Sequence, residues 1–279
     1  MKLSIITVNL NNAAGLKKTI ESVAAQTFKE FEYVVIDGGS TDGSIEILKA
    51  HADKITYWVS EPDKGIYNAM NKGILQAQGE YLQFLNSGDW LENETILSQV
   101  FDIQRSAGIL YGNMNEVSPD GKIKLQVPLI GDRLTMANFN TNTHATVQHP
   151  ASFIRTSLFE KGLYDEQYRI IADIKFFIER IIIQNCTVEY LPFVITNFNL
   201  EGLSSNPVNW TKTIDERARI FSELLPPRIL KDYEIFFQVK DSALLEHIPL
   251  LEKTSSLKNM VNSGVGYVVK IYKLLKGKS

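Results

Sequence analysis

Apolar and polar positions follow two alternating periods along the first 90 residues. Short apolar runs at 3–8, 33–36, 55–59 and 81–85 are typical of buried strands. Between them, apolar residues recur at helical spacing: Leu16, Ile20, Val23 and Ala24 form one such face, and further faces begin at Ile45 and Ile66. This repeat predicts the α/β class, with a mostly parallel sheet, right-handed crossovers and helices on both faces.

The pattern is less regular beyond about residue 105. Strands are predicted at 109–111, 151–154 and 187–196, with a break at Pro192, a turn at 119–121 and a loop or short helix at 130–140. A strong apolar helical face follows Asp173. Past Asn206 the sequence predicts helices interrupted by Pro226 and Pro227.

Composition narrows the classes of protein that remain. With 44% hydrophobic and 22% charged residues, the chain is expected to be globular rather than disordered. A net charge of −3 provides no general basic field for nucleic acid. The single cysteine, Cys186, excludes an internal disulfide and a thiolate zinc cluster and fits a reducing compartment. The first residues predict no signal peptide and no apolar run predicts a membrane span, so we expect a cytoplasmic protein.

Polar loops follow each of the first four predicted strands, at 9–12, 37–42, 61–65 and 86–89. The carboxyl ends of parallel strands meet at one edge of a sheet, where ligands of open α/β folds bind. Each loop alone is also an ordinary turn or cap. Two of the loops end in isolated carboxylates and one carries a lysine, a set suited to a phosphorylated or nucleotide ligand with a divalent cation.

Two other nucleotide-binding patterns are missing from the expected position. The first predicted strand is followed by Asn-Leu-Asn-Asn, where a dinucleotide-binding fold carries G-x-G-x-x-G. The chain also lacks the P-loop pattern G-x-x-x-x-G-K-[ST]. Hydride transfer and ATP hydrolysis therefore lose support.

Four ordered segments resemble the family 2 glycosyltransferases of the GT-A fold. They are SIITVNLNN at 4–12, ESVAAQTFKEFEYVVIDGGSTDGS at 21–44, SEPDKGIYNAMNKGI at 60–74 and GEYLQFLNSGD at 79–89. Weaker similarity continues to about residue 205. The third segment is similar to that of bacterial enzymes of surface polysaccharide biosynthesis. The resemblance implies an inverting transfer of a sugar from a nucleotide-diphosphate sugar to a glycan or lipid-linked acceptor hydroxyl.

The resemblance also implies roles for residues in the donor half of the site. Asn9 and Asn11 would lie beside the nucleoside and Asp37 would contact the base, although Gly38 stands where the family commonly has a second acid. Lys64 would meet the diphosphate, or is a solvated surface lysine. The stretch 86–89 occupies the place of the family's D-x-D-type metal motif. Asn86 and Gly88 replace the usual acids there, which leaves Asp89 as the single charged ligand for Mg²⁺ or Mn²⁺.

Two later residues match the family's acceptor side. His149, in VQHPASFIRTSLFE, would orient a diphosphate or a sugar hydroxyl, or is a structural histidine. Asp173, in YRIIADIKFFIER, matches the catalytic carboxylate and would act as general base; without the resemblance it is most simply a helix N-cap. The segment NLEGLSS at 199–205 is similar to a further family segment that closes the site.

Three divisions of the chain and two rival functions follow from this reading. Residues 1–105 would form the nucleotide-sugar-binding part of the GT-A domain, 106–205 its acceptor-binding and catalytic part, and 206–279 a helical C-terminal extension.

A nucleotidyltransferase is one rival function, but it needs a glycine-rich basic first loop, which residues 9–15 lack. The second rival is a nucleotide-sugar-binding protein with little transferase activity, in which the acids replaced by Asn86 and Gly88 would no longer be needed.

A helical stripe of apolar residues with lysines on one flank runs along residues 257–275. It predicts either a helix docked on the catalytic domain or an interfacial helix on an anionic membrane. A lipid-linked acceptor would favour peripheral contact with the inner face of the plasma membrane.

Overall fold

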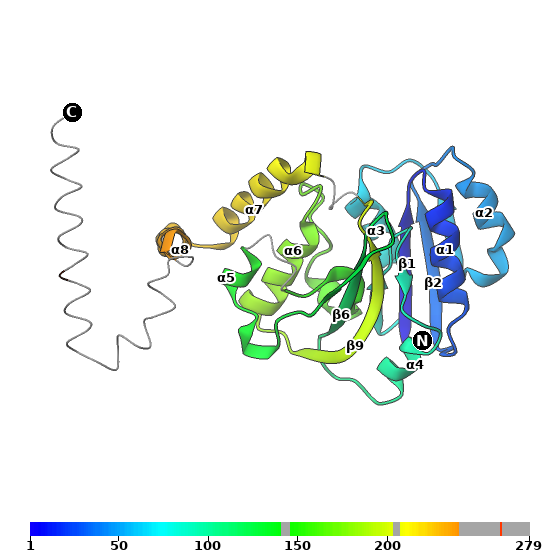
Figure 1. Ribbon diagram of the computed structural model, residues 1–279, viewed down its shortest axis with the longest axis horizontal. Helices are drawn as coiled ribbons and strands as arrows, with labels where there is room; N and C mark the ends of the chain where they lie inside the picture. The colour runs from blue at the N-terminus through cyan, green and yellow to red at the C-terminus, as the bar shows by residue number, and fades with distance from the viewer. Residues whose placement is uncertain (141–145, 203–206, 240–262, 264–279) are drawn as a thin grey trace. The chain divides into compact units, whose positions relative to one another are not determined.

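The computed structural model describes residues 1–140, 146–202, 207–239 and 263 (Figure 1). The chain divides into two units, Met1–Leu224 and Leu225–Ser279. Apart from Ser263, the predicted amphipathic stripe at 257–275 lies outside the described residues. Of the helices in the described part, none has the length and apolar character needed to cross a bilayer.

Strands and helices alternate through the first unit. The strands are β1 (Leu3–Asn9), β2 (Phe31–Asp37), β3 (Tyr57–Ser60), β4 (Tyr81–Phe84), β5 (Trp90–Leu91), β6 (Ile109–Val117), β7 (Ile123–Gln126), β8 (Ser152–Arg155) and β9 (Val188–Asn199). The helices are α1 (Ala13–Ala24), α2 (Ser44–Ala50), α3 (Ile66–Gln76), α4 (Ile96–Phe101), α5 (Met136–Phe139), α6 (Ala172–Phe177) and α7 (Trp210–Leu224), and α8 (Pro227–Val239) lies in the second unit.

The first four strands form the parallel half of the sheet, as predicted. β1 lies between β2 and β4, with Leu3 opposite both Phe31 and Tyr81, and β3 pairs with the outer side of β2. Every residue of β1 is buried. A strand covered on both faces needs apolar residues on both, which is why these strands show continuous apolar runs rather than alternation.

The second half of the sheet is mixed, whereas the sequence predicted a mostly parallel sheet. The order is β3-β2-β1-β4-β8-β6-β9-β5, with β7 paired to β6. β8 is antiparallel to both β4 and β6, and β9 is parallel to β6. β6 and β9 therefore run in the direction of β1–β4. Their carboxyl ends lie on the same edge, so Asn199 at the end of β9 belongs to the predicted ligand edge.

Helices cover both faces of the parallel half. One face buries Leu3 and Ile5 with apolar residues of α1, α2 and α4, and α1 and α2 are seen beside the blue part of the sheet in Figure 1. On the other face α3 packs closely through Gly73, where an added Cβ would lie 2.5 Å from the Cγ2 of Ile6. Glycine at this position lets helix and strand approach more closely than a side chain would allow.

Several local features differ from the sequence prediction or were missed by it. The sequence predicted no element at 90–105, where β5 and α4 form. Pro192 lies in β9, whose register against β6 shifts between Leu191 and Val194. This irregularity accommodates a residue that cannot donate to the ladder. After Phe177, α6 continues as a π-helix over Ile178–Ile183.

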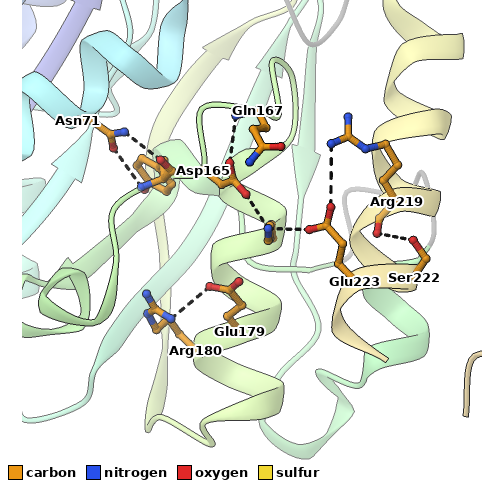
Figure 2. A network of polar contacts seen from close by, with 10 residues as sticks. Asn71, Asp165, Gln167, Glu179, Arg180, Arg219, Ser222 and Glu223 are labelled. Carbon is orange, nitrogen blue, oxygen red and sulfur yellow. Dashed lines mark hydrogen bonds and ion pairs between the residues drawn. The ribbon is translucent and has the colours of Figure 1, made fainter. Parts of the chain in front are cut away.

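Helix α7 belongs to the first unit, although the sequence placed it in the C-terminal extension. The ammonium group of Lys175 on α6 lies 2.7 Å from the carboxylate of Asp165 and 2.9 Å from that of Glu223 on α7. Figure 2 shows Asp165 and Glu223 facing each other across this contact. A second contact, through Glu216, ties α7 to the start of α6. The division of function between 1–105 and 106–205 stays a prediction.

Candidate active site

Asp37 is the centre of a closed hydrogen-bond network at the ends of β1, β2 and β3. Its Oδ1 accepts bonds from Asn9 Nδ2 at 2.7 Å and from the Ser40 hydroxyl at 2.6 Å. Its Oδ2 accepts from the Ser60 hydroxyl at 2.6 Å and from the backbone N–H groups of Gly39 and Ser40. Burial raises the pKa of Asp37, but these hydrogen bonds outweigh burial and lower it below the ordinary value. The side chain is ionised, fully buried and saturated.

The two asparagines predicted to lie beside the nucleoside hold the first loop to the second. Asn9 is buried and donates to Asp37 and to Ser40. Asn11 has a φ of 50°, a left-handed conformation that asparagine tolerates better than most residues. Its side-chain oxygen accepts the Thr41 N–H at 2.8 Å, and its own N–H donates to Ser40. Asn11 is exposed, whereas Asn9 lies beneath the surface of the edge.

The turn after β4 is anchored to α1. Asn12 caps α1 by accepting the Gly15 N–H and donates through Nδ2 to the Ser87 carbonyl at 3.0 Å. Thr19 accepts the Gly88 N–H at 3.0 Å and donates to the backbone carbonyl of Asp89 at 2.7 Å. Gly88 adopts a φ of 105°, which favours glycine. A residue with a Cβ would be strained at this position.

Asp89 carries a poorly compensated charge. Only 3% of the residue is exposed, and its Oδ1 accepts the backbone N–H of Asn199 at 2.9 Å. Burial raises the pKa of Asp89 to about 7, although the Asn199 hydrogen bond and the positive charge of Lys18 act in the opposite direction. In the same turn, Asn86 Oδ1 is buried without a hydrogen-bond partner. Both side chains therefore carry oxygens of the type that divalent cations bind.

The donor set nevertheless differs from a preformed metal cage. Within the described ranges, no group of three or more histidine, cysteine, aspartate and glutamate side chains is arranged to hold a metal. Mg²⁺ is commonly bound by one or two protein carboxylates together with substrate phosphates and water. Asp89 and Asn86 therefore fit a cation that arrives with a phosphorylated ligand rather than one held by the protein alone.

The loop after β3 connects the two halves of the edge. The Asp63 carboxylate lies against Gly38, in the space that a Cβ at this position would occupy, and its Oδ1 accepts the Gly65 N–H at 2.7 Å. Arg169 Nη1 donates to the backbone carbonyl of Lys64. Lys64 itself is exposed, and no contact of its ammonium group is observed with the described residues. This loop therefore links Gly38 in the donor half to residue 169 near Asp173.

Asp173 lies in the first turn of α6. Its N-cap is Ile171, so the alternative reading of Asp173 as an N-cap is wrong. The carboxylate is partly exposed, and Oδ1 accepts the hydroxyl hydrogen of Tyr67 at 2.7 Å. Among the described residues, no hydrogen bond to the other oxygen, Oδ2, is observed. A carboxylate with one oxygen fixed and one free is suited to accept a proton.

The start of α6 is capped from another helix. Glu216 of α7 is 8% exposed and accepts three consecutive backbone N–H groups: Arg169 at 2.6 Å, Ile170 at 3.0 Å and Ile171 at 3.1 Å. Free N–H groups at a helix start need acceptors, and a carboxylate also interacts favourably with the positive end of the helix. This contact fixes the backbone just ahead of Asp173.

Replacing Glu216 by alanine should lower the free energy of unfolding by about 2 kcal/mol, because it leaves buried N–H groups without acceptors. Urea denaturation measures this loss. Glu223→Ala removes a more exposed carboxylate from the same helix, with 44% of its side chain accessible, and should cost less than about 1 kcal/mol. Equal losses in the two variants would contradict the capping role.

His149 lies inside an aromatic cluster. It is 8% exposed, its ring stacks on Phe84 at a centroid distance of 4.9 Å, and Nε2 shares a hydrogen bond with the Tyr164 hydroxyl at 2.8 Å. Burial lowers the pKa of His149, while the charge of Asp173 acts in the opposite direction. These contacts favour the structural alternative for this residue.

The predicted residues fall into separate groups, and each group has partners that the sequence did not reveal. One network contains Asn9, Asn11 and Asp37. A second group contains Asn86, Gly88 and Asp89. Lys64 lies on the loop that Arg169, four residues before Asp173, contacts. The sequence analysis did not single out Asp63, Tyr67, Asn199 or Glu216. Tyr67 lies in the segment SEPDKGIYNAMNKGI at 60–74, so the family resemblance could have pointed to it. Glu216 lies on an amphipathic helix, and no local pattern distinguishes it.

Comparison with known proteins agrees with this arrangement. The family model described as "Glycosyl transferase family 2" matches residues 4–163. A protein of Mycobacterium bovis (strain BCG / Pasteur 1173P2) named "PGL/p-HBAD biosynthesis glycosyltransferase" is 32% identical over 212 residues, which cover 74% of this chain and 79% of that protein.

Two solved structures share the fold. Residues 1–349 of S. aureus TarS, in complex with UDP-GlcNAc, align with a TM-score of 0.62 and 20% identity over 84% of this chain and 70% of that one. The mannosyltransferase PcManGT from Pyrobaculum calidifontis, in complex with GDP-Man and Mn²⁺, aligns with a TM-score of 0.53 and 14% identity over 100% of this chain and 88% of that one. At these identities the likeness shows the GT-A-like α/β fold alone.

Proposed function

Because the chain belongs to glycosyltransferase family 2 and is a transferase enzyme, we propose that it moves a sugar from a nucleoside diphosphate to an acceptor hydroxyl with inversion at the anomeric carbon. The observation that carries this proposal is the setting of Asp173. One of its oxygens is fixed by Tyr67, and its segment is joined to the donor loop through Arg169 and Lys64. In this proposal, the base Asp173 and the loop that carries Lys64 contact the same bound donor and acceptor.

The proposed reaction is a single displacement. The acceptor oxygen forms a bond to the anomeric carbon as the bond from that carbon to the diphosphate oxygen breaks. The acceptor proton passes to Oδ2 of Asp173, and the nucleoside diphosphate leaves with the electron pair of the broken bond. Lys64 offsets the negative charge that grows on the leaving group. Each step uses a group at the sheet edge.

Donor binding is assigned to the loops after β1, β2 and β3. Asp37 is saturated by hydrogen bonds within the protein, so its proposed part is to fix the shape of the loop against which the base lies. Asn9 supports the same network, and Asn11 is exposed beside it. The bound UDP-GlcNAc of TarS and GDP-Man of PcManGT make nucleotide sugars the class of donor to test first.

A divalent cation is the proposed cofactor. Asp89 and Asn86 would hold Mg²⁺ or Mn²⁺ together with the donor phosphates, as the buried unpaired oxygen of Asn86 and the raised pKa of Asp89 suggest. Such an ion neutralises charge on the leaving diphosphate when bound. Lys18 supplies a positive charge near Asp89 in the protein itself.

The proposed acceptor is a bacterial surface glycan or a lipid-linked glycan. The name of the mycobacterial relative refers to PGL and p-HBAD biosynthesis, which supports the glycan or glycolipid class. A lipid-linked acceptor would bring the enzyme to the inner face of the plasma membrane, in keeping with the amphipathic stripe predicted for residues 257–275. We assign His149 a structural role: it supports the aromatic cluster on the proposed acceptor side of the site.

A screen of nucleotide sugars tests the proposed function directly. Thermal unfolding would be followed with UDP-, GDP- and dTDP-sugars, with and without Mn²⁺, together with slow release of nucleoside diphosphate. We expect one nucleotide class to raise Tm more strongly with Mn²⁺ and to be hydrolysed slowly. Pyrophosphate release from a nucleoside triphosphate and a sugar phosphate would indicate a nucleotidyltransferase instead. Binding without any turnover, even with added acceptors, would indicate a binding protein.

A further inference from the structure

Tyr67 makes a contact with Asp173 that the proposed reaction has not yet used. It is the second residue of α3, is 6% exposed, and lies 106 residues before Asp173 in the sequence. Its hydroxyl oxygen lies 2.7 Å from Asp173 Oδ1 and 2.8 Å from the Ile170 carbonyl oxygen. Burial raises the pKa of Tyr67, and the negative charge of Asp173 adds to this effect. The hydroxyl therefore stays protonated and acts as a donor.

A single hydroxyl hydrogen faces two acceptors of different strength. A carboxylate is the stronger acceptor while it is ionised, because hydrogen bonds to charged groups are roughly twice as strong as those between neutral groups. The bond to Asp173 is therefore favoured over the bond to Ile170, and it fixes Oδ1. Oδ2 is the oxygen for which no such bond is observed in the described part of the chain, so it is the oxygen left for the acceptor proton.

Helix α3 is joined to the segment that leads to Asp173 by more than Tyr67. Asn71 exchanges hydrogen bonds with the backbone N–H and carbonyl of Tyr164, and both Asn68 and Asn71 donate to the carboxylate of Glu166. Figure 2 shows Asn71 reaching toward this segment. The Tyr67 and Tyr164 rings lie 5.5 Å apart. These contacts hold the Tyr67 ring in place, so its hydroxyl has a fixed position relative to α6.

The residues before Tyr67 form the donor loop, and the residue that it contacts is the proposed base. Gly65 ends the loop that carries Lys64, and Tyr67 follows two positions later. The Tyr67 hydrogen bond therefore joins the helix that follows the donor loop to the carboxylate of the proposed base.

We propose that Tyr67 is a positioning residue that holds Oδ1 of Asp173 and directs Oδ2 to the acceptor hydroxyl. This inference rests on the proposed role of Asp173 as the base. The other titratable groups that interact electrostatically with Asp173 are His149, Tyr164 and Arg217. They lie on other elements, and for none of them is a hydrogen bond to Asp173 observed. Tyr67 is thus the direct contact that orients the carboxylate.

The test replaces Tyr67 by phenylalanine, which keeps the buried ring and removes only the hydroxyl. We expect kcat to fall about 10- to 100-fold, the range given by losing a hydrogen bond to a charged group. KM for the donor should stay within about twofold, because the donor contacts are unchanged. A lowered kcat with an unchanged donor KM is the result expected of a positioning residue, because a general loss of folding would not spare donor binding.

Tyr81→Phe is the matched control. Tyr81 is a fully buried tyrosine at the start of β4, the end of the strand away from the ligand edge, and its hydroxyl donates to the Ala107 carbonyl at 2.8 Å. It should lower Tm but leave kcat within about twofold of the unmodified value. A Tyr67→Phe enzyme with the kcat of the unmodified enzyme would overturn the inference.

Two further measurements separate the possible failures. If Asp173→Asn abolishes turnover while Tyr67→Phe has no effect, the inference fails and the proposed function stands. If Asp173→Asn is fully active, both fail. Should Tyr67→Phe not fold, 4-aminophenylalanine at position 67 keeps the ring and replaces the hydroxyl by a weaker hydrogen-bond donor. It should then lower kcat without a change in donor KM, and an unchanged kcat overturns the inference.

Discussion

Replacing Asp173 by asparagine should lower kcat for sugar transfer by about 10²- to 10⁴-fold, the contribution typical of a positioned general base. Asparagine has nearly the same shape, and its side-chain oxygen can still accept the Tyr67 hydroxyl hydrogen. It cannot take a proton from the acceptor. Donor affinity should therefore change little, because the interaction that is lost is made only in the transition state. Steady-state kinetics with donor and acceptor varied separately would measure this difference.

Asp165→Asn is a suitable control for that experiment. Asp165 lies on the same segment, its carboxylate contacts Lys175, and Figure 2 shows it beside Gln167. Its removal should weaken packing between α6 and α7 but leave kcat near that of the unmodified enzyme. Transfer by Asp173→Asn at the unmodified rate would remove the base assignment, and comparable losses in both variants would reduce it to an effect on folding.

The parallel half of the fold was predictable because its physical signals are local. β1 is buried at every residue, so its apolar run is continuous, and the helical spacing of Leu16, Ile20 and Val23 matches their burial against the sheet. The mixed half was less predictable because its pairings join strands far apart in sequence. Ile109 on β6 pairs with both Ile154 and Val188, and no local pattern specifies those partners.

In the candidate site, too, local features were predictable and contacts between distant residues were not. Asn9, Asp37 and Asp89 follow strands, and a shared strand direction is enough to place them on one edge. Their contacts were not predictable, because they depend on side-chain geometry. Asp37 is saturated by five hydrogen bonds, and Asp89 is tied to Asn199, which follows it by 110 residues. The Glu216 cap is likewise a tertiary contact, with no capping pattern in the sequence around α6.

Asp89→Asn should make the metal-free protein more stable at pH 8. Burial raises the pKa of Asp89 from 3.8 to about 7 in the folded state. The folded protein therefore binds this proton more tightly than the unfolded chain does. The stability that the carboxyl group contributes is complete below about pH 4 and is lost as pH rises through 7. The difference corresponds to roughly 4 kcal/mol, which asparagine would remove.

The free energy of unfolding of both proteins, measured with chelator between pH 5 and 8, would test this expectation. The unmodified protein should lose stability across that interval relative to Asp89→Asn. Asp42→Asn should instead be less stable than the unmodified protein throughout this interval. The Ser44 hydroxyl lowers the pKa of Asp42, so its ionised form stabilises the fold and that contribution is lost only below the ordinary pKa of 3.8. Parallel curves for the unmodified protein and Asp89→Asn would show that Asp89 carries no destabilising charge.

The same variant separates a metal ligand from a structural carboxylate. If Asp89 holds a cation with the donor phosphates, Mn²⁺ and a nucleoside diphosphate together should raise Tm of the unmodified protein at pH 8. A ligand present at 100 times its Kd stabilises the folded state by about 2.7 kcal/mol, and Asp89→Asn should lose most of this gain. Asparagine still accepts the Asn199 N–H, so the turn is preserved and the lost response reports on the ion. An equal response in both proteins would mean that the buried charge of Asp89 serves the turn and β9, and that any cation is held by other oxygens.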